Sequence, residues 1–467
     1  MTRTQLFKNK AIIMKEILSS LRDYFDTGQT FDIEWRKTQL RAIIEMLEKE
    51  TVSLSKALHE DLGKSAEEAW LTEIGFVQHE ARFVLRHVAK WARARRVKTP
   101  LFLMPGRSRI QPQPRGLALI ISPWNYPAQL ALSPLIASVA AGNVTVLKPS
   151  ELSPACAKWF TEMIPKYLDP KAVAVIEAGP EKTSELLKEP FDFIFFTGST
   201  KTAHYITRAA AEHLTPTVLE LGGKSPCIVT NCNHIKTAAS RIVFAKFLNA
   251  GQTCVAPDYI LVEEKLKPQL IEALKTAITE QFGPENAPNN FVHIIHKGHY
   301  ERLCNMLNHG EKILFGGKCT PETLHIAPTL IEADMSHPSM QEEIFGPILP
   351  ILTLTETDAI GQALKLVAEH PTPLAAYLFS DRKEDVKRAK RLICGGFAHN
   401  DALMHLTNAH MPFGGVGQSG HGGSHGQFGF ESFSHMRSEL LQSQLDIPLR
   451  YPPFTESAMK WLRRFMH

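Results

Sequence analysis

From Gly116 onward, short apolar segments alternate with longer segments of helical periodicity, and no other feature of the sequence constrains the fold as strongly. The first apolar segments read LALIIS, NVTVLK, AVAVIE, FDFIFF and TVLEL, and they lie between residues 117 and 221. Alternation of this kind predicts a parallel sheet with crossover helices. The segments are short and rich in β-branched and aromatic residues, as strands buried on both faces should be.

A second alternating block follows the LGGKSP segment at 221–226 and predicts a second α/β domain. Its expected strands are CIVT, YILVEE, ILPILTL and AAYLFS. Helices are expected between them, over 236–248, 265–281, 357–369 and 382–392. The fold class is therefore α/β, with two domains that each have a parallel-sheet core.

The ends of the chain differ from these two blocks. Residues 5–95 mix polar and apolar positions at helical spacing and predict helices. Residues 100–114 contain four prolines, which suit an extended ribbon or edge strands. The C-terminal segment, residues 451–467, combines prolines with a short basic amphipathic helix. It is expected to pack as a terminal helix, or else to lie on a partner subunit or weakly on a membrane surface.

Composition excludes several classes of function. A formal net charge of +4 is too small to indicate nucleic-acid binding. No apolar stretch reaches the ~18 residues that a membrane span requires, and the N-terminus lacks the features of a signal peptide. Seven cysteines, with no CxxC pair, argue against a disulfide framework and a metal site. A reducing, cytoplasmic compartment is the expectation.

Three side chains at the ends of predicted elements are candidates for chemistry. Cys254 follows a predicted helix end at Asn249 and Gly251 and is interpreted either as a nucleophile, since it lies in a loop at the end of an element, or as an inert buried thiol. Glu220 ends a predicted strand and is interpreted either as a base that activates water or as a surface glutamate. Asn125 follows the strand LALIIS and is interpreted either as an oxyanion donor or as a helix cap.

Two strand-to-helix junctions favour a nucleotide site. Lys148 and Glu151 follow the strand NVTVLK, where ligands of open α/β sheets bind. Gly198 and Ser199 precede a helix one unit later, and a helix N-terminus suits a phosphate. A helix cap is the alternative at each junction. The GxGxxG fingerprint of standard dinucleotide sites is absent there.

Together these segments resemble the aldehyde dehydrogenase superfamily over about residues 30 to 450. The resemblance rests on motifs in the family's order, namely PWNYP, LKPSE, FTGST, LELGGKSP, GQTC, EEIFGP and PFGGVGQSGHGGSHG. The GQTCVAPDY form and the closing GHGGSHGQFGFESFSHMR are similar to the class 3 branch, which acts on fatty and aromatic aldehydes. This resemblance implies oxidation of a hydrophobic aldehyde to its acid with NAD or NADP. NAD is favoured, because the Glu151 carboxylate would repel the 2′-phosphate of NADP.

The resemblance also assigns roles to individual positions. It makes Cys254 the nucleophile that carries a thioester, Glu220 the general base, and Asn125 part of the oxyanion hole. The residues implied in cofactor binding are Trp124, Lys148, Glu151, Gly198, Ser199, Glu343 and Phe345. The residues implied in lining an aldehyde tunnel are Tyr126, Phe244 and Phe413. Ala203 departs from the glycine of many family members, and its methyl is expected to reduce cofactor affinity modestly.

The same resemblance implies a domain organisation and a homodimer. A Rossmann-like nucleotide-binding domain with a helical N-terminal region takes residues 1–99 and 115–221, and a catalytic domain takes 222–411. A small β ribbon for oligomerisation takes 100–114 and 427–450. Two other functions stay open: transfer of the acyl group to coenzyme A, and a catalytically inactive structural relative. Glu220 argues against the first, and joint retention of Cys254, Glu220 and Asn125 argues against the second.

Overall fold

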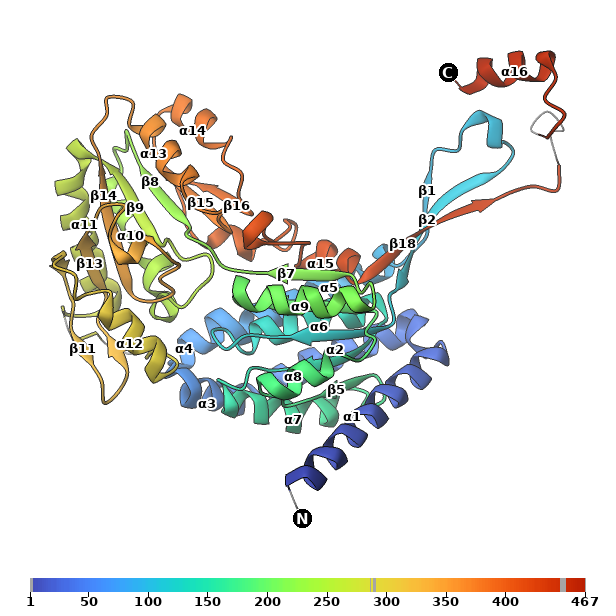
Figure 1. Cartoon of the computed structure of the whole chain (residues 1–467), viewed down its shortest axis with the longest axis horizontal. Helices are drawn as coiled ribbons and strands as arrows, with labels where there is room; N and C mark the ends of the chain where they lie inside the picture. Colours follow the sequence, from blue (N-terminus) through green and yellow to red (C-terminus); the bar gives the residue numbers. More distant parts are fainter. Residues whose placement is uncertain (1–2, 286, 289–290, 446–450, 467) are drawn as a thin grey trace.

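The computed structural model describes residues 3–285, 287–288, 291–445 and 451–466. The chain forms two bodies, each built around a sheet of mainly parallel strands, and a narrow ribbon that projects from one of them (Figure 1). The prediction of an α/β fold with two parallel-sheet cores is therefore confirmed. Among the described residues, none of the helices is both long enough and apolar enough to cross a membrane.

The N-terminal region is helical, as the periodicity predicts. Its elements are α1 (Arg3–Asp26), α2 (Ile33–Lys49), α3 (Thr51–Leu62), α4 (Ala66–Ala69), the π-helical turn η2 (Trp70–Ile74) and α5 (Gly75–Trp91). Helices α2 and α5 pack against each other and against α6 of the first sheet. The N-terminal helices therefore belong to the same body as the first sheet (Figure 1).

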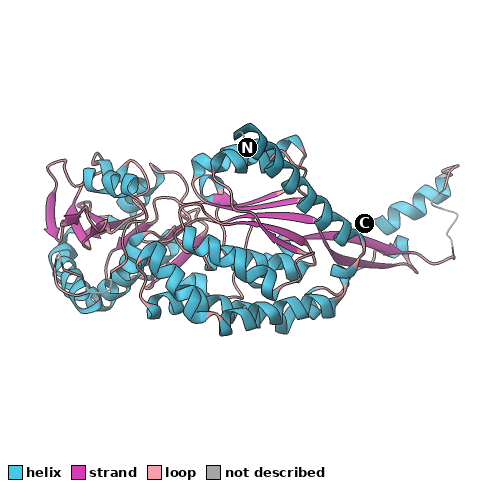
Figure 2. Ribbon diagram, turned by 90° about the horizontal axis from the view of Figure 1, so that it is seen from below, coloured by secondary structure: helices cyan, strands magenta, loops and turns pink. Residues whose placement is uncertain are grey.

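The first sheet has six strands in the order β17-β7-β6-β3-β4-β5. In chain order these are β3 (Leu117–Ile121), β4 (Val144–Lys148), β5 (Val173–Val175), β6 (Phe193–Thr197), β7 (Thr217–Glu220) and β17 (Gly420–His421). All neighbouring pairs are parallel except β17 with β7. The connecting helices are α6 (Gln129–Ala141), α7 (Pro154–Tyr167), α8 (Pro180–Leu186) and α9 (Thr200–Glu212). Helices cover both faces of the sheet (Figure 2).

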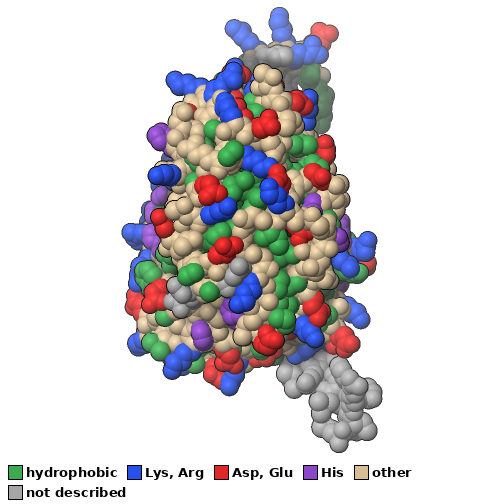
Figure 3. Space-filling model, turned by 90° about the vertical axis from the view of Figure 1, so that its left-hand side faces the viewer, with side chains coloured by type: hydrophobic (Ala, Val, Ile, Leu, Met, Phe, Trp, Pro, Cys, Tyr) green, Lys and Arg blue, Asp and Glu red, His purple; other side chains and the backbone are tan. Residues whose placement is uncertain are grey.

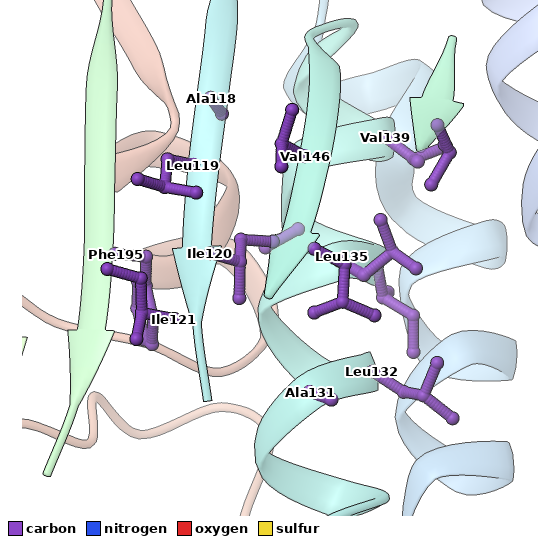
Figure 4. Close-up of a cluster of buried hydrophobic side chains, with 14 of the residues drawn as sticks. Ala118, Leu119, Ile120, Ile121, Ala131, Leu132, Leu135, Val139, Val146 and Phe195 are labelled. Atoms are coloured by element: carbon purple, nitrogen blue, oxygen red, sulfur yellow. The ribbon is translucent and has the colours of Figure 1, made fainter. Parts of the chain in front are cut away.

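The core of this body forms where α6 lies on the sheet. Aliphatic side chains of β3 and β4 meet those of α6, including Ile120, Val146 and Leu135 (Figure 4). Helix α6 is buried on nearly every side, so its sequence is apolar almost throughout. Burying side chains of this size stabilises the fold by roughly 1.5–3 kcal/mol each. This core fixes the ends of the strands, from which the candidate side chains project.

The second sheet has seven strands in the order β10-β13-β14-β9-β8-β15-β16, and only β10 is antiparallel to its neighbour. The strands are β8 (Pro226–Val229), β9 (Tyr259–Glu263), β10 (Lys312–Phe315), β13 (Thr329–Glu332), β14 (Ile348–Leu354), β15 (Ala375–Phe379) and β16 (Gly396–His399). Four of them match the predicted strands. The sequence missed β10, β13 and β16, since these have only four residues each and two of them are partly exposed edges.

Helices α10 (Ile235–Phe247), α11 (Lys267–Phe282), α13 (Ala359–Ala368) and α14 (Lys383–Ala389) correspond to the four helices predicted in this block. Helix α12 (Lys297–Asn305) and the two-stranded sheet of β11 (Cys319–Thr320) and β12 (His325–Ile326) were not predicted. Single 3-10 turns are η1 (Gln29–Phe31), η3 (Leu101–Leu103), η4 (Leu248–Gly251), η5 (Glu264–Leu266), η6 (Pro338–Met340), η7 (Met404–Thr407) and η8 (Gly417–Ser419). At the outer end of this body, acidic and basic side chains are interspersed (Figure 3).

The ribbon is an antiparallel sheet of β1 (Arg95–Val97), β2 (Arg107–Pro114) and β18 (Ser434–Leu441). Its bounds differ from the expected 100–114 and 427–450. Residues 427–432 belong to α15 (Gly426–Ser432), which packs against α5 and α6, and 446–450 lie outside the described residues. Helix α16 (Glu456–Met466) lies near η3 at the far end of the ribbon (Figure 1).

Candidate functional site

A left-handed turn places Cys254 at the surface of a cavity. Helix α10 ends at Phe247, and Asn249, Ala250 and Gly251 then take φ values of 53°, 51° and 72°. At Gly251 a Cβ atom would lie 2.3 Å from the carbonyl oxygen of Gly346, so only glycine fits. The helix thus stops where the sequence placed its terminators, and the strained turn aims the following residues away from the helix axis.

A buried hydrogen-bond network holds this turn against the loop that carries Asn125. The Asn125 side-chain amide donates to the carbonyl oxygen of Gln252 at 3.0 Å. Asn249 in turn donates to the carbonyl oxygen of Asn125 at 2.8 Å. Helix α6 begins at Gln129 with no side-chain cap, so the interpretation of Asn125 as a helix cap is wrong. The network joins Asn125 to the segment that contains Cys254.

The Cys254 thiol is protonated at neutral pH in its present surroundings. Burial raises the pKa of Cys254 strongly, and the negative charges of Glu343 and Glu220 raise it further. The backbone N–H groups of Cys254 and Val255 act in the opposite direction. Ionisation of this sulfur therefore requires either a nearby positive charge or transfer of its proton to a base.

Glu220, the base that the sequence predicts, is buried. It ends β7, its side chain is only 4 % exposed, and its Oε1 atom is buried with no hydrogen-bond partner among the described residues. The interpretation as a surface glutamate is therefore wrong. Burial raises the pKa of Glu220 to about 8, with a further contribution from the charge of Glu80, while the Ser424 hydroxyl lowers it. A carboxyl group with this pKa exchanges protons near neutral pH.

The three tunnel candidates surround one apolar cavity together with Cys254. Tyr126, Phe244 and Phe413 all line it. Sequence reasoning missed the remaining wall, which includes Leu71, Phe76, Leu130, Met404, Leu406 and His425. The Tyr126 hydroxyl lies 2.7 Å from Oγ1 of Thr253, the residue before the thiol. The cavity therefore suits an apolar molecule whose reactive group meets the sulfur.

The carboxyl edge of the first sheet fits a dinucleotide. The strand order reverses between β3 and β6, and ligands of open α/β sheets bind at such a switch point. Two buried hydroxyl groups at the ends of these strands, Ser122 Oγ and Thr197 Oγ1, have no hydrogen-bond partner among the described residues. Unpaired polar atoms in this place are consistent with a polar ligand.

The predicted nucleotide residues lie along this same edge. Lys148 ends β4, and its Nζ atom lies 2.7 Å from Oε2 of Glu151. Ser199 caps α9 by accepting a hydrogen bond from the Thr202 backbone N–H, at 3.2 Å. Gly198 donates its backbone N–H to the carbonyl oxygen of Glu220, at 3.1 Å. The cap interpretation therefore holds for Ser199, whereas the Gly198 N–H is used in its hydrogen bond to Glu220 at the end of β7.

The EEIFGP loop contributes a second part of this surface. Oε1 of Glu343 accepts a hydrogen bond from Gly223 N–H at 3.0 Å. At Gly222 a Cβ atom would lie 2.1 Å from Glu343 Oε2, so this approach requires glycine. The ring of Phe345 makes an edge contact with that of Trp124, at 5.5 Å between centroids. The EEIFGP loop therefore contacts two segments that are distant in sequence, and its Glu343 lies close enough to Cys254 for its charge to raise the pKa of the thiol.

A buried ion pair that sequence reasoning missed supports the loop of Asn125. Lys64 and Glu73 have fully buried side chains, with Nζ and Oε1 at 2.5 Å. Oε2 of Glu73 accepts hydrogen bonds from the backbone N–H groups of Ala128 and Gln129, at 2.7 and 3.1 Å. The Lys64 ammonium also lies 4.1 Å from the centre of the Tyr126 ring. No local pattern marks these residues, because their partners are distant in sequence.

Ala203 occupies a different position from the one the sequence suggested. Its side chain is 3 % exposed and packs in the hydrophobic core of the first body, within α9. The methyl group therefore points into the core rather than toward a phosphate. Among the residues that the structure describes, no group of three or more His, Cys, Asp or Glu side chains is arranged to hold a metal ion.

Comparisons with known proteins identify the family of the chain. Residues 8–438 match the model of the aldehyde dehydrogenase family. The chain is 43 % identical to aldehyde dehydrogenase family 3 member B1 of Bos taurus, covering 96 % of each chain. It is 42 % identical to 4,4'-diaponeurosporen-aldehyde dehydrogenase of Staphylococcus aureus, covering 97 % of this chain and 99 % of the relative.

The fold shows the same relationship. A solved structure of Staphylococcus aureus AldH in a substrate-bound state superposes with a TM-score of 0.94, at 40 % identity, and the match covers 97 % of this chain and 99 % of that one. A structure of Sinorhizobium meliloti NAD-dependent aldehyde dehydrogenase superposes with a TM-score of 0.85 at 24 % identity, covering 95 % of this chain and 89 % of that one, and shares the fold. The chain belongs to the aldehyde dehydrogenase family.

Proposed function

We propose that this NAD(P)-dependent aldehyde dehydrogenase oxidises hydrophobic aldehydes to carboxylic acids through a thioester on Cys254. The observation that carries the proposal is the apolar cavity in which the Cys254 thiol meets Tyr126, Phe244 and Phe413. The buried carboxyl group of Glu220 lies close enough to raise the pKa of the thiol. A nucleophile, a base and an apolar binding surface are thus combined in one place.

In this proposal the Cys254 sulfur loses its proton and then attacks the aldehyde carbon. Glu220 accepts the proton, because a carboxyl group with a pKa of about 8 exchanges protons near neutral pH. The oxyanion that forms is stabilised by the Asn125 side-chain amide and the Cys254 backbone N–H. One such donor is worth about 3 kcal/mol. The oxidised nicotinamide supplies the hydride acceptor. The acyl group then remains on the sulfur as a thioester.

Glu220 also serves the second half of the reaction. After releasing the thiol proton to solvent it is again a carboxylate, and it removes a proton from the water that attacks the thioester carbon. The carboxylic acid then leaves, and the departing Cys254 thiolate takes up the proton that Glu220 removed from water. Its side chain is buried and its Oε1 atom has no partner among the described residues, so this oxygen is available to bind a water molecule. Hydrolysis rather than transfer to coenzyme A is therefore the proposed fate of the thioester.

The cofactor would be held by residues along the carboxyl edge of the first sheet. Lys148 and Glu151 would bind the adenine-side ribose, and Gly198 and Ser199 would lie beside the pyrophosphate. Glu343 would hold the nicotinamide ribose, with Phe345 and Trp124 against the ring. We favour NAD over NADP, because the Glu151 carboxylate beside Lys148 would repel a 2′-phosphate.

A steady-state screen of aldehydes tests the proposed substrate class. We expect kcat/KM to rise from propanal to octanal with NAD, by up to about fourfold for each methylene group that the cavity buries. Phe244→Ala, which removes part of the wall, should flatten this dependence, whereas Phe428→Ala, at an exposed position of α15, should leave it unchanged. Equal kcat/KM values along the series would contradict a hydrophobic substrate.

The same screen with both cofactors tests the preference for NAD. We expect kcat/KM in the native protein to be higher with NAD than with NADP. In Glu151→Gln the two kcat/KM values should lie closer together, because the variant carries no charge at residue 151 to repel the 2′-phosphate. A native protein that prefers NADP would overturn this part of the proposal.

The Lys64–Glu73 pair provides a test of how the oxyanion loop is positioned. We expect Glu73→Gln to lower kcat about 10- to 100-fold with a smaller change in KM, because the loop of Asn125 loses its anchor. Leaving the Lys64 charge buried and unpaired should also lower the unfolding temperature. Glu67→Gln, an exposed change in the same segment, is the control. An unchanged kcat in a folded Glu73→Gln variant would exclude this role.

We also propose that the chain forms a homodimer through the ribbon. Apolar side chains along its strands are exposed, among them Val97, Met436, Leu440 and Leu441. Burying such a patch against a second copy is favourable. Light scattering on the purified protein measures the oligomeric state.

Helix α16, which exposes Arg463 and Arg464, is proposed to associate at most weakly with a membrane surface. The seven free cysteines support a cytoplasmic location.

A further inference from the structure

Two thiols outside the catalytic cavity face each other at close range. Cys304, at the C-terminal end of α12, has its Sγ atom 2.8 Å from Sγ of Cys319 in β11. Both side chains are half-buried, and both lie beside the phenol of Tyr300 one turn earlier in α12. A disulfide requires a sulfur separation of about 2.05 Å with converging Cβ atoms. The observed Sγ–Sγ distance exceeds this bonded length by less than about 1 Å.

We propose that Cys304 and Cys319 form a reversible disulfide by exchange with an oxidised low-molecular-weight thiol such as glutathione disulfide. One protein thiolate attacks glutathione disulfide, which forms a mixed disulfide and releases one glutathione. The second protein thiolate then attacks the mixed disulfide and releases the other glutathione. In the balance, two protein thiols are oxidised to one disulfide while glutathione disulfide is reduced to two glutathione molecules, which take up both protons.

The other cysteines lack this arrangement. Cys156, Cys227 and Cys232 are buried, and Cys254 faces the catalytic cavity. Cys394 is half-buried like the pair, but its Sγ atom lies 4.0 Å from the Leu392 carbonyl oxygen rather than against a thiol. Cys394 is therefore the matched control for the pair, since its exposure is in the same range and its sulfur faces no partner thiol.

The disulfide would act on the EEIFGP loop through α12. His299 and Arg302 in this helix bind the loop, with His299 Nε2 2.9 Å from the carbonyl oxygen of Phe345 and Arg302 NH1 2.7 Å from Glu342 Oε1. Arg302 also donates to the carbonyl oxygens of Glu343 and Ile344. Because the sulfurs are already adjacent, the bond would leave the atoms nearly in place. Its effect is to restrict local opening of α12 and of the loop that it holds.

Peptide mapping of the full chain tests the proposal. The protein is equilibrated in glutathione buffers of increasing disulfide content, alkylated and digested, and linked peptides are identified by mass. We expect a Cys304–Cys319 link that disappears on addition of dithiothreitol, is absent from Cys304→Ser and Cys319→Ser, and persists in Cys394→Ser. Mixed glutathione adducts alone, or a link that involves any other cysteine in place of this pair, would overturn the proposal.

Hydrogen exchange then tests the consequence for α12. In the oxidised protein we expect the amides of α12 and of residues 342–346 to exchange about tenfold more slowly than in the reduced protein. In Cys304→Ser we expect these amides to exchange at the same rate in oxidising and in reducing buffer, because the variant cannot form the bond. This control separates the effect of the disulfide from general effects of oxidation. Equal exchange rates in oxidised and reduced native protein would exclude the coupling to the loop. Neither measurement depends on turnover, so their failure is distinguishable from failure of the proposed activity.

Discussion

Replacing Cys254 with alanine should reduce aldehyde oxidation by at least about 10⁴-fold, because no other thiol lines the cavity among the described residues. Turnover is measured from the absorbance of the reduced cofactor with octanal as substrate. Binding of the dinucleotide should persist, since the residues proposed to hold it belong to other segments. A variant that kept even a tenth of the native rate would show that the reaction does not pass through this sulfur.

The control for this experiment is Cys394→Ala. It removes a half-buried thiol that lies outside the cavity, in the connection between α14 and β16. It should retain native turnover. Mass spectrometry of the intact protein, mixed with aldehyde and oxidised cofactor, gives an independent result. An acyl adduct on residue 254 is expected in the Glu220→Gln variant, in which hydrolysis is slowed, and its absence there would contradict the thioester.

Glu220→Gln should separate the two halves of the reaction. We expect the variant to slow steady-state turnover by about 10²- to 10⁴-fold, the usual contribution of general acid–base catalysis. An amide cannot remove a proton from water, so the acyl-enzyme should accumulate and retain its adduct. Because Glu220 is also the proposed acceptor of the thiol proton, formation of the adduct should slow as well, but less than its hydrolysis. Normal turnover in a folded Glu220→Gln variant would refute the assignment.

The pH dependence follows from the same carboxyl group. Burial raises the pKa of Glu220 to about 8, and the group acts as a base only when ionised. The rate of thioester hydrolysis in the native protein should therefore rise as the pH increases through about 8 and level off above it. This rise should be lost in Glu220→Gln but kept in Glu212→Gln, an exposed change at the end of α9.

Adding coenzyme A to the assay should leave the rate and the product of the native protein unchanged, because water is the proposed acceptor of the acyl group.

Much of the site could be predicted from the ends of sequence segments. Apolar segments such as LALIIS and TVLEL become buried strands, so the polar residues that follow them necessarily lie at the carboxyl edge of a sheet. The positions of Lys148 and Glu220 follow from this rule. The edge strands β10 and β16 could not be predicted in the same way, because partial exposure weakens the apolar pattern on which the prediction depends.

The interpretations that failed were those that treated a residue by its local segment. Within its own segment Asn125 is typical of a helix cap. Its side-chain amide instead donates a hydrogen bond to the carbonyl oxygen of Gln252, which directly follows η4. Glu220 looks like a surface residue at a strand end, yet β17 returns from the C-terminal part of the chain and pairs beside it. The segment that was predicted to enter the ribbon at residue 427 is likewise helical up to Ser432, as part of α15, because that helix packs against α5 and α6.

The α/β class, most strands of the two large sheets and the chemical types of the residues at their ends could be read from the chain alone, since all three depend on local periodicity and on the nature of each side chain. The folded arrangement was needed to show which of those ends meet, which carboxyl group loses its water and acquires a pKa near neutrality, and which buried pair supports the Asn125 loop. These properties depend on distance and burial between residues remote in sequence, and neither quantity is encoded in any single segment.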